Sequence, residues 1–475
     1  MTSETKQGIE AWGLSIDAIN ELPERLIGFH ERYRRYLRTR TRDTSEYGMH
    51  YISSLMRMES KRNMANIGRT SEIAEQNMQQ FISDSPWRAD HLIQGVQGDI
   101  SQHQQFSSGN ILIIDESADA KAGEMSAGAG RQHNGRLGKV DCCQVGVYLG
   151  LANNGYQSWV DGELFIPEAW FAENQQEKRQ RIGIPEGRVF ATKLELALQL
   201  IERTQDAGLL SFDAVDMDAL YGRKGWFRDR IAKLDIEYYA DVPANTRIYL
   251  EKPLVYFPKN KQGKLAKQPI VSGVFTTPSQ LKEKATTDWH HFVLRPCERG
   301  MLAADFARFR VWTVDPDGTM RQEWLLIRQD PGDVTYSLSN ASVQTPLLTM
   351  AERKSQRFAI ERANQNAKSE LGWDEFQAIK FRAWSHHLAL SILASWFITE
   401  TKLVWSQKLQ REPSLLQLYE TDVLPALSFA NVRTLLRAAM PLPQLSPQQA
   451  AQLVVKHLDN RTRSRNSRLN PSRSP

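Results

Sequence analysis

The sequence is poor in cysteine, and its cysteines and histidines form no metal-binding pattern. Only 3 of the 475 residues are cysteine, and no Cys-x-x-Cys pair or Cys/His cluster at zinc spacing occurs. The two histidine doublets lack a spaced partner that would complete a ligand set. We therefore expect reduced, buried thiols and structural histidines. These residues are Cys142, Cys143, Cys297, His290, His291, His386 and His387.

Membrane-spanning and secretory patterns are also missing. No uninterrupted apolar run is long enough to cross a bilayer, and the opening segment MTSETKQGIEAWG does not place basic residues before an apolar stretch. The composition, 41% apolar and 24% charged, is that of an ordinary globular protein. We expect a cytoplasmic protein of about two to four structural units, at roughly 100–200 residues each.

The glycine-rich segment GEMSAGAGRQHNGRLGKV matches neither common nucleotide-binding pattern. It contains no Gly-x4-Gly-Lys-Ser/Thr, and Gly128 and Gly130 are followed by His133 where Gly-x-Gly-x-x-Gly needs a third glycine. We therefore predict no nucleotide site. A flexible loop over residues 123–138, lying near a polyanion, is the better interpretation. Its basic residues are Arg131, Arg136 and Lys139.

Positive charge is concentrated in two tracts. The formal net charge is only +5, but residues 30–42 carry six arginines and one acid, and residues 460–475 carry five arginines and no acid. Basic tracts of this kind suit a polyanion such as DNA. The alternative is a solvated helix face in the first tract and a disordered tail in the second.

The spacing of apolar residues predicts helical ends and an α/β centre. Residues 1 to about 90 read as helical, including one helical pattern over 51–69. From residue 108, short apolar runs predict buried strands, and residues 192–208 predict a helix with a capping box formed by Thr192 and Glu195. Residues 309–327 predict a hairpin turning at Asp-Pro-Asp-Gly. After residue 350 the pattern is helical again.

Acidic residues follow two of the predicted strands. Asp115 ends the apolar run in NILIIDES, while Asp216 and Asp218 end a second run in SFDAVDMDALYG and would share one strand face. Such strand ends can present side chains to a ligand. With Glu361, carboxylates from three elements could hold two hard cations. Taken alone this signal is weak, because acids after strands commonly cap helices or occupy turns.

The segment RFAIERANQNAKSELG, residues 357–372, predicts a helix with a charged stripe. Positions i+4 and i+11 are rotated from position i by roughly 40° and 20°, so Arg357, Glu361 and Lys368 align. The stripe borders an apolar face that must pack on the core. Without other information, an ordinary i,i+4 ion pair explains it. The apolar face consists of Ile360, Ala363, Ala367 and Leu371.

Several motifs together resemble DDE transposases of bacterial insertion sequences, in the insertion-sequence-four-type supergroup. The spacing Arg357-x3-Glu361-x6-Lys368 resembles that group's Tyr-x2-Arg-x3-Glu-x6-Lys motif. ILIIDES and RQHNGRLGKVDCCQVGVYL resemble the first-aspartate strand and the segment after it. VDMDALYG resembles the second-aspartate strand, which favours Asp218 over Asp216. SDSPW and WSHHLAL are also similar to one branch, so the resemblance covers roughly residues 50–400.

The sequence departs from this family pattern at two positions. Lys354 stands where the motif has tyrosine, which leaves the role of that position open. Glu116 follows Asp115 where relatives often have a second aspartate.

The resemblance implies an α/β fold with an RNase H-like catalytic core, a β-rich insertion, and helical regions on either side. On this basis we expect a set of consecutive units along the chain. They are a helical DNA-binding domain (1–100), the first part of the core (101–244), the insertion (245–345), the third-acid helix of the core (346–400), a C-terminal helical region (401–459) and a basic disordered tail (460–475).

The resemblance further implies cut-and-paste DNA transposition with two Mg²⁺ ions, for which Mn²⁺ can substitute. Asp115, Asp218 and Glu361 would hold the metals, with Asp216 as the alternative second acid. The DNA contacts would come from Arg357 and Lys368, joined by Arg131 and Lys139 of the glycine-rich segment. A homodimer is implied, because two element ends must be brought together.

Three alternatives stay open from the sequence. The chain could be a DNA-binding regulator that kept the fold without catalysis, although intact acids argue against it. It could be a metal-dependent nuclease without strand transfer. Trp312 or Trp324 of the insertion could stack on an extruded base, or either could be an ordinary β-core tryptophan.

Overall fold

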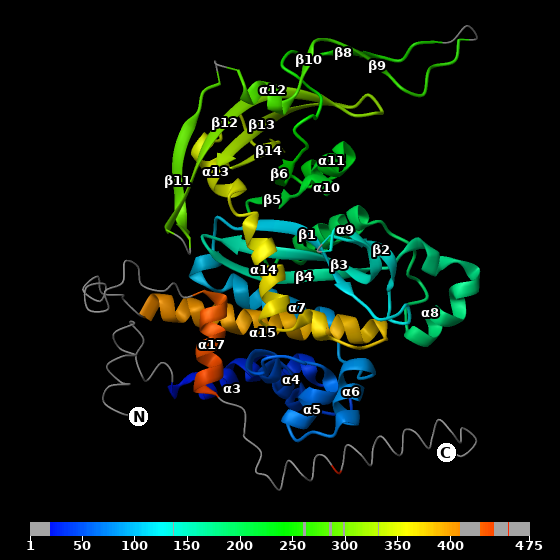
Figure 1. Cartoon of the computed structure of the whole chain (residues 1–475), viewed down its shortest axis with the longest axis vertical. Coiled ribbons are helices and arrows are strands. Elements are labelled where there is room, and N and C mark those ends of the chain that lie inside the picture. Colours follow the sequence, from blue (N-terminus) through cyan, green and yellow to red (C-terminus); the bar gives the residue numbers. More distant parts are fainter. Residues whose placement is uncertain are drawn as a thin grey trace.

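In a computed structural model, the structure describes residues 20–135, 137–259, 263–284, 287–297, 300–330, 332–408, 428–440 and 455. The described part is arranged in three tiers, with strands of the insertion at one end, the core sheet in the middle and helices at the other end (Figure 1). The predicted basic tail 460–475 and most of the predicted helical region 401–459 lie outside the described residues.

The core sheet has the strand order of an RNase H-like fold. Strands β1 (Ile111–Ala120), β3 (Lys139–Asn153) and β4 (Tyr156–Phe165) pair antiparallel, while β5 (Ala214–Met217) and β6 (Glu237–Asp241) add in parallel on the other side of β1. The apolar runs at the starts of β1 and β5 are buried, as expected for strands covered on both faces. The predicted α/β fold class is confirmed.

Most strands of segment 245–345 extend the core sheet, while β8 and β9 pair with each other in a separate two-stranded sheet. β14 pairs with β6 at the edge of the core, and β13, β12 and β7 follow in order. The predicted hairpin is present as β12 and β13, joined by a turn in which the Gly318 amide donates to the Asp315 carbonyl. The strand bounds are β7 Ile248–Tyr249, β8 Leu254–Tyr256, β9 Ile270–Ser272, β10 Phe275–Thr276, β11 His290–Cys297, β12 Gly300–Val314, β13 Met320–Asp330 and β14 Asp333–Ser339.

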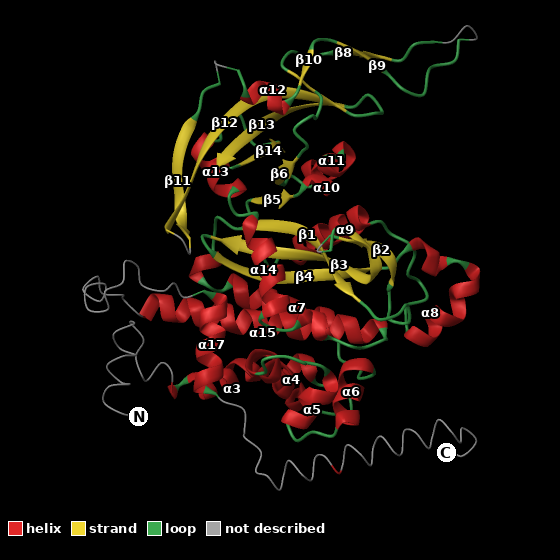
Figure 2. Cartoon of the chain, viewed as in Figure 1, coloured by secondary structure: helices red, strands yellow, loops and turns green. Residues whose placement is uncertain are grey.

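Helices cover both faces of the sheet and gather below it (Figure 2). α9 has the predicted capping box between Thr192 and Glu195 and ends at Gly208. The long helix α15 lies between the sheet and the N-terminal helices (Figure 1). The helix bounds are α3 Leu22–Tyr33, α4 Ser45–Arg57, α5 Met64–Thr70, α6 Glu75–Ser83, α7 Ala89–Ser101, α8 Gln176–Ile182, α9 Lys193–Ala207, α10 Ala219–Gly222, α11 Gly225–Lys233, α12 Pro278–Lys282, α13 Leu347–Lys354, α14 Phe358–Ser369, α15 Phe381–Lys408 and α17 Phe429–Ala439.

One stretch of α15, Phe381–Ser406, is long and apolar enough to cross a membrane by length and composition alone. However, 83% of its most apolar window is buried inside the protein. A core helix meets the same criteria, and the buried His386 and His387 within it bond to neighbouring protein groups.

Two local predictions were wrong. The helical pattern over 51–69 is broken, because α4 ends at Arg57 and a separate helix begins only at Met64, where the Asn63 side chain caps it. The glycine-rich segment is not entirely a loop either. Its residues Gly130–Asn134 form β2, which pairs with the start of β3 and satisfies its backbone there.

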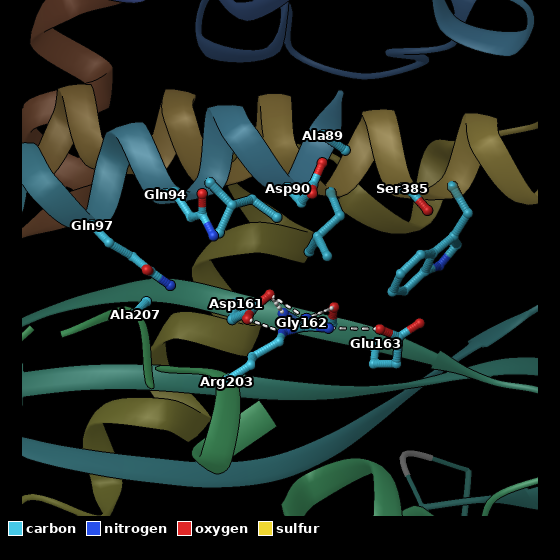
Figure 3. A pocket seen from close by; sticks show the side chains of 13 residues that line it. Ala89, Asp90, Gln94, Gln97, Asp161, Gly162, Glu163, Arg203, Ala207 and Ser385 are labelled. Carbon is cyan, nitrogen blue, oxygen red and sulfur yellow. Dashed lines mark hydrogen bonds and ion pairs between the residues drawn. The ribbon is translucent and has the colours of Figure 1, made fainter. Parts of the chain in front are cut away.

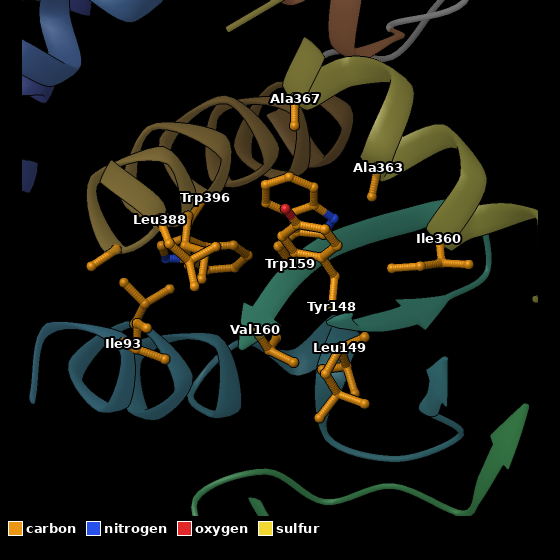
Figure 4. Close-up of a cluster of buried hydrophobic side chains, with 14 of the residues drawn as sticks. Ile93, Tyr148, Leu149, Trp159, Val160, Ile360, Ala363, Ala367, Leu388 and Trp396 are labelled. Carbon is orange, nitrogen blue, oxygen red and sulfur yellow. The ribbon is translucent and has the colours of Figure 1, made fainter. Parts of the chain in front are cut away.

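The predicted helix at 357–372 is α14, and it lies directly on the core sheet. Its apolar residues face the stacked rings of Tyr148 and Trp159 (Figure 4). The approach is close at Gly150 of β3, where a Cβ atom would lie 2.7 Å from Cδ1 of Ile360. Glycine at this position therefore allows α14 to pack closely against β3. All four residues of the predicted apolar face are buried, namely Ile360, Ala363, Ala367 and Leu371.

Candidate active site

Asp115 and Asp218 occupy matching positions on neighbouring parallel strands. The register pairs Ile114 of β1 with Met217 of β5. Asp115 follows Ile114 in the sequence, and Asp218 follows Met217. Burial, with a further contribution from the charges of Glu116 and Asp218, raises the pKa of Asp115 to about 7 even though Arg357 acts in the opposite direction. The Asp115 carboxyl is therefore a buried group with two other negative charges nearby.

Asp218 and Asp216 point to different partners. Asp218 is the N-cap of α10, and its Oδ1 accepts from the backbone N–H groups of Leu220 at 2.8 Å and Tyr221 at 3.4 Å. Asp216 is completely buried and pairs with Nζ of Lys354 at 2.9 Å. The charge of Asp218, and not that of Asp216, is among the causes of the raised pKa of Asp115. This arrangement favours Asp218 as the second acid.

Glu361 lies on α14 but does not join the two aspartates directly. Its carboxylate accepts from Nη1 of Arg357 at 2.8 Å, and its side chain is 48% exposed. In the described part of the chain, no group of three His, Cys, Asp or Glu residues is arranged as a ready metal site. The contact from α14 to Asp115 is made instead by Asn364, one turn beyond Glu361.

Asn364 is a site residue that sequence reasoning missed. Its Nδ2 donates to Oδ2 of Asp115 at 3.0 Å, while its Oδ1 accepts from the indole N–H of Trp159 at 2.9 Å. Because an indole nitrogen can only donate, Trp159 fixes which end of the amide faces Asp115. The sequence did show that Asn364 lies three residues after Glu361, and therefore near it on the helix. It did not show that the Asn364 side chain reaches Asp115 on β1.

Comparison with known proteins identifies the family. A model of the DDE superfamily endonucleases matches residues 33–297. This chain belongs to that family. The match includes Asp115 and Asp218 and stops before α14, so it does not cover Glu361. The chain is also 24% identical, over 306 residues, to the probable transposase for insertion sequence element IS701 of Microchaete diplosiphon, covering 64% of this chain and 68% of that protein.

DDE superfamily endonucleases depend on a divalent metal, and the donor set here suits one chemically. Asp115, Asp218 and Glu361 offer carboxylate oxygens, the ligands that hard divalent cations prefer. The pKa of Asp115 is raised by burial and by the charges of Glu116 and Asp218, and a cation would offset both causes. Glu361 would have to exchange Arg357 for the metal. The residues therefore fit a divalent cation in chemistry, with the third acid paired elsewhere.

Glu116 and Lys368 of this DDE endonuclease are both engaged in contacts with the protein. Glu116 accepts from the hydroxyl of Tyr221 at 3.0 Å and lies 3.4 Å from Nζ of Lys193. Lys368 pairs with Asp119 at 2.8 Å and donates to the carbonyl of Ala118 at 2.8 Å. Lys368 therefore anchors α14 to β1 in the absence of DNA.

The other predicted DNA contacts lie on the β2–β3 hairpin. Arg131 and Lys139 are both exposed there, and Nζ of Lys139 is 3.8 Å from the carboxylate of Asp141. Both are exposed basic side chains of the glycine-rich segment.

Both tryptophans proposed for base stacking carry cations. The guanidinium groups of Arg308 and Arg310 lie 4.4 Å and 5.1 Å from the ring centroid of Trp324, and Nζ of Lys252 lies 5.2 Å from that of Trp312. Each ring is partly buried. The contacts account for both rings as parts of the folded insertion.

A cavity of about 260 Å³ lies away from the acids, between α7, α15 and β4 (Figure 3). Its floor is a charged cluster in which Arg203 donates to both oxygens of Asp161 at 2.6 Å and to one oxygen of Glu163 at 3.0 Å, while Arg188 donates to the other oxygen of Glu163 at 2.7 Å. Because these charges satisfy one another, the cluster joins β4 to α9 as part of the framework.

Proposed function

We propose that this protein is a DNA transposase that cleaves at the terminal inverted repeats of an insertion sequence and joins the 3′-OH ends to target DNA. The observation that carries the proposal is the placing of Asp115 and Asp218 directly after Ile114 and Met217, which pair on adjacent parallel strands, in a chain of the DDE endonuclease family. The name of the matched relative supports transposition over other nucleic-acid chemistry. The strand order supports an RNase H-like core.

Asp115, Asp218 and Glu361 would hold the metal ions, which we propose to be two Mg²⁺. When bound, such ions lower the pKa of an attacking water and stabilise the leaving oxygen of a phosphodiester. The chain's own task is to keep the carboxylates in place. Asn364 orients Asp115 by a 3.0 Å hydrogen bond, and the two backbone N–H groups of α10 orient Asp218.

Arg357 is the side chain that we assign to a DNA phosphate near the cut. Its guanidinium is partly exposed and lies 2.8 Å from Glu361, on the side of α14 that carries the proposed third acid. A fixed cation there stabilises the negative charge that develops in the transition state. Lys368 would contact a phosphate only by exchanging Asp119. Arg131 and Lys139 would bind the duplex farther out.

The proposed partners are double-stranded DNA at the element ends and the target, and a second copy of the chain. The arginine-rich tract at residues 30–42 supports DNA binding, although part of its charge is balanced by Asp43 and by acids outside the tract. We place the protein in the cytoplasm, bound to the nucleoid DNA.

The test is strand cleavage on duplexes that carry the inverted repeats flanking the gene. We expect nicking at the repeat ends with Mg²⁺, and its loss in Asp115→Ala, Asp218→Ala and Glu361→Ala. Asp141→Ala is the matched control, because Asp141 lies on β3 outside the acid set.

Each outcome separates one alternative. Cutting without preference for the repeats would indicate a nuclease without strand transfer. Repeat binding with no cutting under any metal would indicate a regulator. Full activity in all three alanine variants would disprove the acid assignment.

A further inference from the structure

Lys354, which stands in place of the motif tyrosine, is buried between two carboxylates. Its Nζ lies 2.9 Å from Oδ1 of Asp216 and 2.8 Å from Oδ1 of Asp241. Only 3% of the Lys354 side chain and none of the Asp216 side chain is exposed. If this ammonium turned toward DNA, it would leave Asp216 as an uncompensated buried charge, which is strongly unfavourable. Lys354 is therefore fixed in the protein interior.

Asp241 extends this pair toward the site. It ends β6, the strand next to β5, and its side chain is 14% exposed. Its Oδ1 also accepts from the hydroxyl of Ser337 at 2.6 Å, while its Oδ2 lies 3.3 Å from Nε of Arg357. Asp241 is thus held on one side by Lys354 and Ser337, and it holds Arg357 on the other.

Arg357 completes a line of alternating charges. Its Nη1 donates to Glu361 at 2.8 Å, so the line runs through Asp216, Lys354, Asp241, Arg357 and Glu361. The inner members are buried and the outer member is 48% exposed. Exposed i,i+4 pairs are weak, whereas buried pairs are costly to break. Glu361 can therefore leave Arg357 while Arg357 stays on Asp241.

We propose that Asp241, braced by Lys354 and Ser337, is a positioning residue that sets how firmly Arg357 holds Glu361. With Asp241 in place, the guanidinium is shared between two carboxylates and releases Glu361 to a metal ion. Without Asp241, Glu361 is the remaining ion-pair partner of Arg357 among the described residues and is withheld from the metal. The proposal rests on the proposed function, because it takes Glu361 as a metal ligand.

The test is Mn²⁺ binding to the full-length, DNA-free protein, measured by isothermal titration calorimetry. We expect Asp241→Asn to weaken Mn²⁺ binding about tenfold, the lower end of the effect seen for groups behind metal ligands. Asp241→Asn also removes a charge, so the same substitution is made in Arg357→Gln. There its effect should fall below about twofold, because the group through which it acts is gone.

Ser337→Ala is a second probe that leaves every charge unchanged. It removes one brace of Asp241 and should weaken Mn²⁺ binding about twofold to threefold in the parent, and not in Arg357→Gln. It also serves if Asp241→Asn does not fold. Asp315→Asn is the matched control, because Asp315 is a 16% exposed partner of Arg321 in the insertion. It should leave Mn²⁺ binding unchanged.

Equal weakening by Asp241→Asn in both backgrounds would mean a through-space charge effect and would overturn the proposal. So would an unchanged Mn²⁺ affinity in both Asp241→Asn and Ser337→Ala. Failure of the proposed function has a different signature. In that case Asp115→Ala would leave Mn²⁺ binding intact, whatever Asp241→Asn does.

Discussion

In the insertion, the buried carboxylate of Glu323 is surrounded by donors, whereas in the core, the buried carboxylate of Asp115 accepts from the Asn364 amide and lies near the negative charges of Glu116 and Asp218. Glu323 accepts from Arg228 at 2.8 Å and from the hydroxyl of Tyr238 at 2.6 Å. Burial alone would raise the pKa of Glu323, but Arg228 and these hydrogen bonds hold it below its usual value. Burial and like charges instead raise the pKa of Asp115 to about 7.

The comparison separates two uses of buried charge. A carboxylate such as Glu323, whose donors are Arg228 of α11, Tyr238 of β6 and Thr313 of β12, ties those three elements together. A buried carboxylate with other negative charges nearby, such as Asp115, lowers the stability of the fold, and a bound cation would offset that cost. The difference predicts opposite consequences for neutralising each group.

Asp115→Asn should have the largest effect on activity and should not lower the stability of the fold. We expect strand cleavage to fall by about 10²–10³-fold, because one of the carboxylates that we propose to hold the metal ions loses its charge. The midpoint temperature of thermal unfolding should be equal to or higher than that of the parent, because the substitution removes a buried charge that neighbouring charges repel. A variant that cuts normally or melts earlier would contradict the comparison.

Glu323→Gln should show the reverse. It leaves Arg228 buried without its carboxylate, which we expect to lower the free energy of unfolding by about 3 kcal/mol. Urea unfolding followed by circular dichroism measures it. Cleavage per folded molecule should be unchanged. Glu202→Gln, on an exposed pair with Arg230, is the control and should shift stability only slightly.

His387 tests burial without charge. It lies completely buried between the rings of Trp373 and Phe376, and burial lowers its pKa to about 3. The unfolded chain takes up a proton below its pKa of about 6.5, while the folded protein does not, so stability falls as pH drops from about 6.5. The loss should reach about 2 kcal/mol at pH 5.

The slope of stability against pH, measured by urea unfolding between pH 7 and 5, isolates this contribution. His387→Phe should flatten the slope even if absolute stability falls, because it also loses the bond to the Tyr51 hydroxyl. His50→Phe, at an exposed histidine, is the control. An unchanged slope in His387→Phe would show that the group titrates normally.

Asn364→Ala should have the smallest effect. It removes the amide that orients Asp115 without changing any charge. We expect cleavage to fall about tenfold with little change in substrate affinity, as for other groups that orient a ligand. Gln365→Ala, one residue along the exposed side of α14, is the matched control. Equal losses in both variants would indicate a general weakening of the helix.

Local chemistry made much of this architecture predictable. The capping box at Thr192 and Glu195, the turn at Asp315 and the apolar stripe of α14 each depend on residues a few positions apart. The break before Met64 was missed because apolar spacing continues across it, while the signal that decides, Asn63 as a cap, is a single residue. Strand β2 was missed because its partner, not its own composition, makes it a strand.

In the candidate site, too, local patterns were predictable from the sequence, whereas contacts between distant elements were not. Two of the proposed acids stand after predicted strands, but all three were assigned from motifs that resemble the transposase family, and the family match covers the two aspartates. Asn364, Asp241 and the burial of Lys354 could not be read from the sequence, because each depends on contacts between elements more than 100 residues apart. The sequence also gave no sign that β14 would pair with β6 and make one continuous sheet of the core and insertion.

The packing of α14 against Gly150 also determines when the site can form during synthesis of the chain. Asp115 and Asp218 belong to strands that pair with each other, but the helix carrying the proposed third acid lies 143 residues beyond Asp218, at Glu361. At roughly 5–20 residues per second, the ribosome needs on the order of ten seconds to make that stretch. A nascent chain therefore holds two acids and no α14, and the site is completed only when synthesis of the insertion has ended.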